Sequence, residues 1–136
     1  MKKKIGIRQK ALEQAYQKML SDIQDYAIVY IDLDGTILTW NKGAAEIKGY
    51  KAEEIIGENF SIFYTPEDRK LGLPETLLNL AKKEGRAKHI GKRLRKDGTT
   101  FWGSVLLTAL FDEKSNEVIG FIKLTRELRG NDMGYS

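Results

Sequence analysis

Residues 86–125 read RAKHIGKRLRKDGTTFWGSVLLTALFDEKSNEVIGFIKLT, and this stretch decides the fold. Three runs within it lie at 86–95, 99–111 and 117–125, and the segments between them carry turn-forming residues. The last two runs are rich in β-branched, aromatic and leucine residues, and the first holds Ile90 and Leu94 among basic residues. Runs of this kind, bounded by turn signals, predict β-strands, and short connections join antiparallel neighbours. We therefore predict two consecutive hairpins that form an antiparallel meander.

The chain before this meander adds two predicted strands and several short helices. Residues 26–31 form a continuous β-branched and aromatic run, residues 32–35 supply a turn, and residues 36–40 are typical of the return strand of a hairpin. Asn41 is a suitable N-cap and Gly49 a suitable end for the first of the short helices, and Gly85 is a suitable end for the last. Helices are predicted over residues 42–48, 51–56 and 74–84. Because strands and helices are segregated, we predict an α+β fold, in which short helices cover one face of a five-stranded antiparallel sheet.

The N-terminal segment, residues 8–24, has the spacing of an amphipathic helix. Its apolar positions recur at intervals of three and four residues, so they fall on one face. They are Leu12, Tyr16, Leu20 and Ile23. The stripe lasts only about two heptads, and the helix is expected to lie on the domain or to pair with a second copy in a homodimer. The predicted organisation is a basic tail and helix over 1–24, a domain over 25–126 and a tail over 127–136.

Composition limits the classes to which the protein can belong. The 136 residues are 41% hydrophobic and 31% charged, as is typical of one soluble globular domain. Cysteine is absent, which excludes disulfides, thiolate metal sites and thiol nucleophiles. No apolar run approaches the ~20 residues that span a bilayer, and the apolar segment after Lys4 is too short for a signal peptide. We expect a cytoplasmic protein without a transmembrane segment.

The net charge of +4 is distributed unevenly. The first ten residues hold five bases and no acid, and residues 82–96 hold eight bases against Glu84 alone. The second stretch lacks the interleaved aromatic residues of single-strand binding, so cations that guard a sheet edge explain it better than a phosphate-binding surface does. A nucleic-acid partner is therefore not expected.

Six fragments occur in a fixed order along the chain. They are Asp32-Leu33-Asp34-Gly35, Trp40-Asn41 with Ala44-Ala45 and Gly49-Tyr50, Glu53-Glu54-Ile55-Ile56-Gly57, Phe63-Tyr64-Thr65-Pro66-Glu67-Asp68, Arg95-Lys96-Asp97-Gly98, and Phe101-Trp102. Over residues 22–126 the chain thereby resembles the PAS superfamily, specifically the PAS domains of bacterial sensor histidine kinases. The resemblance implies a sensory or protein-interaction module without catalysis of its own, commonly dimeric and joined to an effector such as a kinase of a two-component system.

The sequence departs from this family at three points. Light-sensing members attack a bound flavin with a cysteine, and the absence of cysteine excludes that adduct. Haem-binding members usually supply a histidine from the helix before the third strand, whereas His89, the only histidine, follows Gly85, which argues for a solvated edge residue and against haem. A non-covalent flavin or another small molecule stays open as the ligand. The family's closing Asp-x-Thr is replaced by Glu127-Leu128-Arg129, and because only seven residues follow Arg129, the chain is interpreted as an excised module or a free-standing protein.

The stretch Asp32-Leu33-Asp34-Gly35-Thr36 also matches the opening motif of haloacid-dehalogenase-like phosphatases. There the first aspartate is the nucleophile and the second the general acid/base. That chemistry needs a downstream acidic pair for a metal ion, and the candidates Asp97, Asp112 and Asp132 lack the required setting. Short motifs recur by chance, so a turn is the preferred interpretation, and neither an enzyme nor a metal site is expected.

Apolar residues of the expected helices and strands are the candidates for a ligand pocket. The predicted set is Ile47, Tyr50, Ile55, Phe60, Phe63, Leu77, Leu78, Leu94, Trp102, Leu106 and Phe121. The same residues could fill a core without voids, so a pocket for a small apolar or aromatic ligand and a ligand-free dimerisation module both stay open. Signal output is assigned to the stripe of the N-terminal helix and to residues 125–128.

Overall fold

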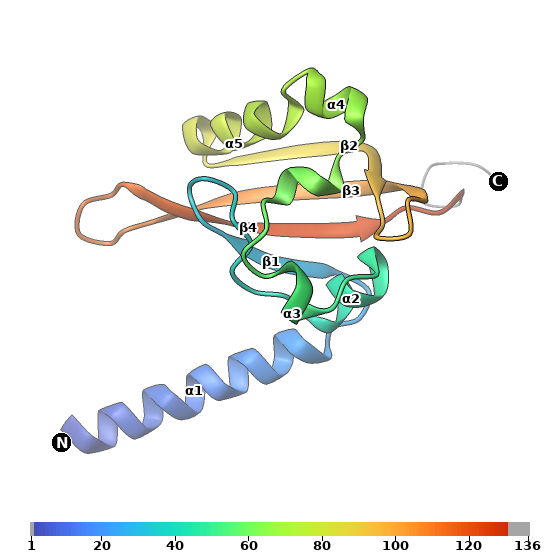
Figure 1. Ribbon diagram of the computed structural model, residues 1–136. Helices are drawn as coiled ribbons and strands as arrows, with labels where there is room; N and C mark the ends of the chain where they lie inside the picture. Colours follow the sequence, from blue (N-terminus) through green and yellow to red (C-terminus); the bar gives the residue numbers. More distant parts are fainter. Residues whose placement is uncertain (1, 131–136) are drawn as a thin grey trace.

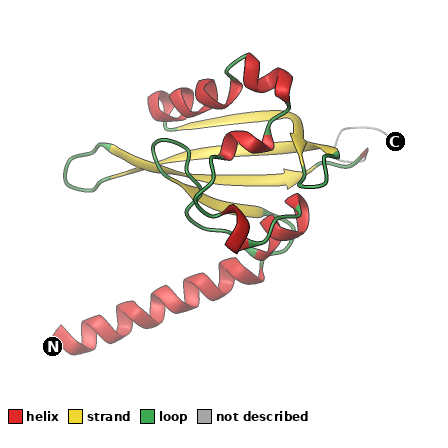
Figure 2. Cartoon of the chain, in the orientation of Figure 1, coloured by secondary structure: helices red, strands yellow, loops and turns green. Residues whose placement is uncertain are grey.

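An antiparallel sheet forms the centre of the molecule, and short helices cover one of its faces (Figure 1, Figure 2). The computed structural model describes residues 2–130, and their side chains from residue 6 onward. The strands are β1 (Ala27–Ile31), β2 (Arg86–Leu94), β3 (Thr100–Phe111) and β4 (Val118–Glu127), in the sheet order β1-β4-β3-β2. Both predicted hairpins are present, since β2 pairs with β3 and β3 with β4, each antiparallel.

The prediction of a return strand over residues 36–40 is wrong, because the described sheet has four strands and the backbone of this segment pairs with β1 only at the isolated bridge between Ile31 and Ile37. Two N–H groups of β1 that a fifth strand would satisfy with its carbonyls find side-chain acceptors instead. Ile28 N donates to Asn41 Oδ1 at 2.9 Å, and Tyr30 N donates to Thr39 Oγ1 at 2.8 Å. The segment therefore follows the path of a return strand without its regular ladder.

The helical layer follows the predicted caps. Asn41 caps the first helix by accepting a hydrogen bond from Ala44 N, and Gly49 ends that helix at φ 82°. Gly85 ends the last helix at φ 91°. Both ends need a left-handed conformation, which glycine adopts without a Cβ clash. The elements are α2 (Lys42–Lys48), α3 (Ala52–Ile55), the 3-10 turn η1 (Phe60–Phe63), α4 (Pro66–Lys70) and α5 (Leu73–Glu84).

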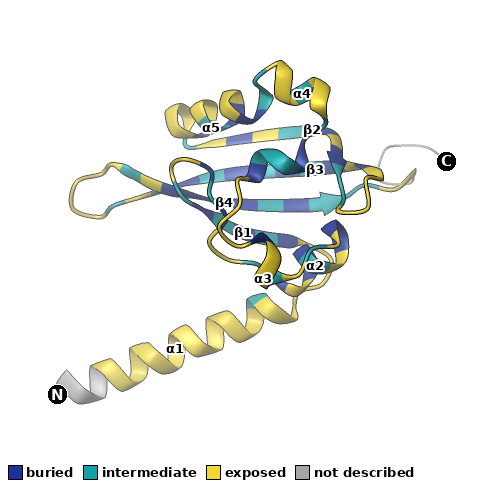
Figure 3. Cartoon of the chain, viewed as in Figure 1, coloured by how far each residue is buried: buried dark blue, intermediate teal, exposed yellow. Residues whose placement is uncertain are grey.

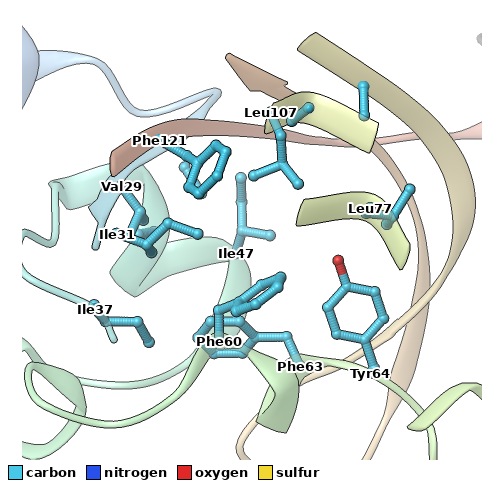
Figure 4. Packing of buried hydrophobic residues seen from close by; sticks show 14 of the residues in the cluster. Val29, Ile31, Ile37, Ile47, Phe60, Phe63, Tyr64, Leu77, Leu107 and Phe121 are labelled. Carbon is cyan, nitrogen blue, oxygen red and sulfur yellow. The ribbon is translucent and has the colours of Figure 1, made fainter. Parts of the chain in front are cut away.

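The two faces of the sheet differ in burial (Figure 3). On β3 every second residue from Phe101 to Ala109 is buried toward the helices, whereas the residues between them are exposed or half-buried. This alternation follows from the pleat of a strand. We call the helix-covered side the inner face and the opposite side the outer face. The core on the inner face includes Val29, Ile31, Phe60, Phe63, Leu107 and Phe121 (Figure 4).

The N-terminal helix α1 (Lys2–Asp22) projects away from the sheet (Figure 1). It begins earlier than the predicted residue 8, and it ends two residues before the predicted end. Its predicted apolar stripe is largely uncovered, with Leu12 at 69% and Tyr16 at 61% exposure. Only near the domain does the helix become partly buried, at Leu20 (Figure 3).

Candidate functional site

Aromatic side chains pack together between the helical layer and the inner face. Phe63 stacks on Trp40, with ring centroids 5.7 Å apart, and meets Tyr50 edge-on at 6.0 Å. Phe60 meets Tyr64 edge-on at 5.6 Å. Offset and edge-on arrangements of this kind are the favourable geometries for aromatic pairs. In Figure 4 the Tyr64 hydroxyl points inward among the surrounding apolar side chains.

Most of the predicted pocket residues lie together on this side of the sheet. Those that are buried in the core, or packed against it, are Ile47, Tyr50, Ile55, Phe60, Phe63, Leu77, Leu78 and Phe121. The pocket prediction has to be corrected for three other residues, because the alternation of side chains along β2 and β3 places them on the outer face. They are Leu94, Trp102 and Leu106. Trp102 is 42% exposed, and Leu106 lines a surface groove on the outer face with Leu124 and Arg126. These three cannot line a pocket between the helices and the sheet.

Three cations are buried on the inner face, and they were not among the predicted site residues. Lys48 is the last residue of α2, Arg93 lies near the end of β2, and Lys123 lies in the middle of β4. Each has a relative exposure of 0%. Charged side chains are rarely buried to this extent unless a partner compensates them. The interior is therefore polar at one point, against an otherwise apolar lining.

The two lysines lie against the same aromatic ring. Lys48 Nζ is 3.8 Å from the centroid of the Phe63 ring, and Lys123 Nζ is 5.1 Å from it. Lys123 Nζ also donates to Thr125 Oγ1 at 3.1 Å, whereas Lys48 Nζ has no hydrogen-bond partner within the described part of the chain. A ring face attracts a cation but doesn't neutralise it.

Arg93 occupies the neighbouring part of the interior. Its guanidinium carbon lies 4.1 Å from the centroid of the Tyr64 ring. Nη1 donates to the carbonyl of Lys92 at 3.0 Å, and Nη2 lies 3.1 Å from Nδ1 of His89, which must accept because an arginine can only donate. Over the residues described, Arg93 Nε and the Tyr64 hydroxyl make no hydrogen bond. His89 thus lies on the edge strand β2, as its sequence position suggested, but it is half-buried beside Arg93 and not fully solvated.

Burial perturbs the protonation of this cluster. It lowers the pKa of Lys48 well below the usual range, with the Lys123 and Arg93 charges acting in the same direction. Burial lowers the pKa of Lys123 to about 7. The pKa of Tyr64 is raised, again chiefly by burial, and the pKa of His89 is lowered by burial and by Arg93. Loss of hydration disfavours the charged form of each group, and the like charges add to this effect on the cations.

The helix α2 links this interior to the N-terminal helix. The Nδ2 atom of Asn41, its N-cap, donates to the carbonyls of Leu20, Ile23 and Tyr26, at 3.3, 3.2 and 2.9 Å. Gly43 allows the close approach, because a Cβ at this position would clash with the carbonyl oxygen of Tyr26. One buried amide therefore ties the end of α1 and the start of β1 to the start of α2.

The other end of α2 is linked to the end of β4. Arg95 Nη1 donates to the carbonyl of Ile47 at 2.9 Å, and Arg95 Nη2 pairs with Glu127 Oε1 at 2.6 Å. The backbone of Leu128 continues the contact by donating to the carbonyl of Trp102 at 2.8 Å. Glu127, at which the sequence departs from the family pattern, thus forms an ion pair with Arg95. Arg95 belongs to one of the fragments on which the family resemblance rests.

The Asp32–Thr36 motif forms a turn. Asp32 Oδ1 accepts hydrogen bonds from the N–H groups of Asp34 and Thr36, both at 2.9 Å, and Gly35 takes φ 88°. The strand before it, β1, pairs antiparallel with β4, unlike the parallel scaffold of the phosphatases considered above. Within the described side chains no three acidic or histidine residues gather as metal ligands would. Asp132 lies outside the described residues.

Fold and interior together define a class of small α+β modules in which a helical layer covers one face of an antiparallel sheet. The family model described as PAS fold matches residues 14–124, and the chain belongs to the PAS family. It is a PAS signalling module, and PAS domains are in general sensory rather than enzymatic.

Known proteins similar to the chain agree with this membership. It is 44% identical over 117 residues to two-component system protein A of Emericella nidulans, and the match covers 86% of this chain but only 17% of that protein. The PAS domain of a Colwellia psychrerythraea protein has a TM-score of 0.78 at 24% identity, covering 86% of this chain and 97% of the other. The PAS domain of an HTR-like protein from Haloarcula marismortui has a TM-score of 0.67 at 26% identity, covering 90% and 99%.

Two further findings bear on the setting of the module. No helix between residues 2 and 130 combines the length and apolarity needed to cross a bilayer. An apolar groove runs between α1 and the sheet, lined by Tyr16, Leu20, Ile28, Tyr30 and Ile122 among others.

Proposed function

We propose that this chain senses a small molecule between its helical layer and the inner face of the sheet. It would relay occupancy through its terminal segments to an effector, a histidine kinase or similar regulator, in the cytoplasm, and catalyse no reaction itself. The relative from Emericella nidulans, named as a two-component system protein, supports the signalling role. The pocket residues we propose are the eight predicted ones that pack in or against the core: Ile47, Tyr50, Ile55, Phe60, Phe63, Leu77, Leu78 and Phe121.

The observation that carries this proposal is the connection of α2 at both of its ends. Its last residue, Lys48, reaches the buried interior, and the carbonyl of Ile47 is held by Arg95, which pairs with Glu127. Its N-cap, Asn41, is bonded to the end of α1. A ligand that shifts α2 would therefore change the packing at two exits from the domain, the end of α1 at residues 20–24 and the end of β4 at residues 126–128. A packed interface with two discrete arrangements passes on a local change in this way.

Hydrogen exchange tests this relay without knowledge of the ligand. Phe63→Leu alters the interior against which α2 packs, and we expect faster exchange at residues 20–24 and 126–128. The control is Leu71→Ala, because Leu71 is 80% exposed between α4 and α5. Unchanged exchange at both exits in Phe63→Leu, with a measurable change elsewhere in the core, would contradict the relay.

We further propose that α1 pairs with a second copy through Leu12, Tyr16, Leu20 and Ile23, whose stripe is mostly uncovered within one chain. Leu12→Glu with Tyr16→Glu should convert a dimer into a monomer, as measured by light scattering. Lys10→Gln with Gln14→Glu changes the net charge equally on the opposite face of the helix and should leave the dimer intact. A dimer that survives the first pair of substitutions would rule out this interface.

A ligand-free interaction module is the second candidate, favoured by the apolar groove between α1 and the sheet. Native mass spectrometry of the purified protein separates the two candidates. A co-purified small molecule supports sensing, and a bare chain that only dimerises supports the interaction module.

The remote alternative is a phosphatase that uses Asp32 as its nucleophile. A Mg²⁺-dependent phosphatase activity that Asp32→Asn abolishes would support this alternative.

A further inference from the structure

Three basic side chains share the interior of this domain without a carboxylate partner. Among the described side chains, none of Lys48, Arg93 and Lys123 belongs to an ion pair, since the ion pairs there involve other residues. Acidic side chains reach this region only at longer range, where Asp68 of α4 acts on Arg93 and Glu75 of α5 acts on Tyr64. Three elements that are distant in sequence therefore bring three cations together without a carboxylate.

Such an arrangement is costly for the empty protein. A buried charge without a partner loses its hydration and receives nothing in exchange, so buried charges are normally paired or discharged. The two lysines can discharge by releasing a proton. Arg93 cannot, because a guanidinium keeps its proton throughout the physiological range. Lys48 Nζ, Arg93 Nε and the Tyr64 hydroxyl make no hydrogen bond within the described residues, and each of them can donate to an acceptor.

We propose that Lys48, Arg93 and Lys123, with the Tyr64 hydroxyl, form an anion site that takes a small organic carboxylate. This inference rests on the proposed sensory function and names the chemistry of its ligand. The carboxylate lies among the three cations, and the apolar or aromatic body of the ligand lies against the rings of Phe63 and Tyr64. Arginine suits this role because its planar fork can bind both oxygens of a carboxylate.

The lining favours a carboxylate over inorganic phosphate. A carboxylate carries a single negative charge and an apolar body, so less hydration is lost when it enters a site walled by aromatic rings. The paired residues Gly91 and Gly103 let Arg93 pack closely against the backbone of the inner face, since a Cβ at Gly103 would lie 3.4 Å from Arg93 Cγ. Side chains at these two positions would press on the guanidinium and its neighbour His89.

Anion binding should be coupled to proton uptake. A negative charge among the cations favours protonated lysine, so it reverses the lowering of the pKa of Lys48 and Lys123 that burial causes. The other titratable groups that act on the cluster are His89 from β2, Tyr64 after η1, Asp68 from α4 and Glu75 from α5. Affinity should therefore fall as the pH rises above about 7, because the lysines are then neutral before binding.

Isothermal titration calorimetry tests the anion site directly. The probes are the sodium salts of acetate, benzoate and succinate, with benzamide as the uncharged counterpart of benzoate and with inorganic phosphate, all at constant ionic strength and about pH 6.5. At least one carboxylate should bind more tightly than benzamide and phosphate. Lys123→Met should weaken that binding by about tenfold or more, as expected for the loss of a charge-assisted hydrogen bond. The matched control is Lys88→Met, since Lys88 is exposed on the outer face of the same sheet.

Proton uptake provides a second readout at about pH 8, where Lys123 is mostly neutral before binding, so the binding enthalpy should vary with the ionisation enthalpy of the buffer, and less so in Lys123→Met. The anion site is overturned if no carboxylate binds, if benzamide binds as well as benzoate, if phosphate binds more tightly than every carboxylate, or if Lys123→Met binds like the wild type. Benzamide binding would leave the sensory pocket standing while removing the anion site. Failure of the hydrogen-exchange relay with carboxylate binding intact would instead remove the relay and keep the site.

Discussion

Lysine side chains on the inner and outer faces of the sheet differ in burial and in their surroundings. Lys123 on the inner face is fully buried beside Phe63, and its pKa falls to about 7 because burial removes its hydration. Lys88 and Lys92 on the outer face are exposed, and Lys92 Nζ lies 5.9 Å from the centroid of the Trp102 ring. A cation on an open face can be stabilised by water and by a ring at once. The difference teaches that burial, and not residue type, turns a lysine into a candidate site.

The largest expected difference between the two faces is the loss of stability when an apolar side chain is truncated. Phe63→Ala removes a fully buried ring that contacts Trp40, Tyr50 and both buried lysines, and it should lower the free energy of unfolding by about 3–5 kcal/mol. Ile90→Ala, at a residue of the outer face that is 53% exposed, should cost about 1 kcal/mol or less. Urea unfolding measures both. Equal losses for the two variants would break the comparison.

The pH dependence of stability should distinguish the buried lysines from the exposed ones. The folded protein holds fewer protons than the unfolded chain between the lowered pKa of Lys123, about 7, and its ordinary value of 10.5. Stability therefore rises with pH in this window, by up to ~1.4 kcal/mol per pH unit for each such lysine. Between about pH 7 and about pH 9 Lys123 should increase the free energy of unfolding by about 2–3 kcal/mol, and Lys48 should act in the same direction.

Two variants sharpen this prediction. Lys123→Met should lose one lysine's share of the slope and should be no less stable than the wild type at about pH 7, because an apolar side chain needs no hydration. Lys88→Met should keep the slope of the wild type. A flat profile in the wild-type protein would mean that both buried lysines stay charged when the protein is empty.

A smaller loss of stability is expected from a substitution at the contact between the start of α2 and the end of α1. Asn41→Ala removes the N-cap of α2 and the bonds to the end of α1, and should cost about 2 kcal/mol. Hydrogen exchange should increase at residues 20–28 and leave α5 unchanged. Asn59→Ala is the matched control, since the Asn59 side chain caps η1 and bonds to the backbone of Asp34 and Ser61. Faster exchange at residues 20–28 in that control would mean that the effect is not specific to Asn41.

The smallest effect is expected at the exit of β4. Glu127→Gln weakens the ion pair with Arg95, whose side chains are 25% and 28% exposed, and should cost at most about 1 kcal/mol. The loss should shrink at high salt, because exposed charges are screened. Lys96→Met, which removes the more exposed pair with Glu54, should cost less still. A salt-independent loss in Glu127→Gln would point to altered packing instead of a lost ion pair.

Local signals in the sequence were sufficient for much of the fold. The cap residues Asn41 and Gly49 predicted the bounds of α2, residues 42–48, as the structure has them. Turn residues between apolar runs predicted both hairpins of the meander. These features depend on a few neighbouring residues, and such short-range preferences act in any context. The ordered fragments were likewise sufficient for the family.

Strand facing could not be predicted with the same success. Phe101 and Trp102 are adjacent aromatic residues, so either could have faced the helices, and the pocket assignment of Trp102 was wrong for this reason. The return strand at 36–40 also depended on context, because the side chains of Thr39 and Asn41 compete with its backbone for the N–H groups of β1.

The sequence by itself determined the three-stranded meander, the bounds of α2 and the family. Only the tertiary structure decided that Lys48, Arg93 and Lys123 share one interior. Strand alternation places Lys123 on the same face as Phe121, but it does not say which face the helices cover or what lies opposite. The register of β4 against its neighbours, and the position of α2 over the sheet, arise from packing across the whole chain. A charge cluster built from residues 48, 93 and 123 exists only once that packing is complete.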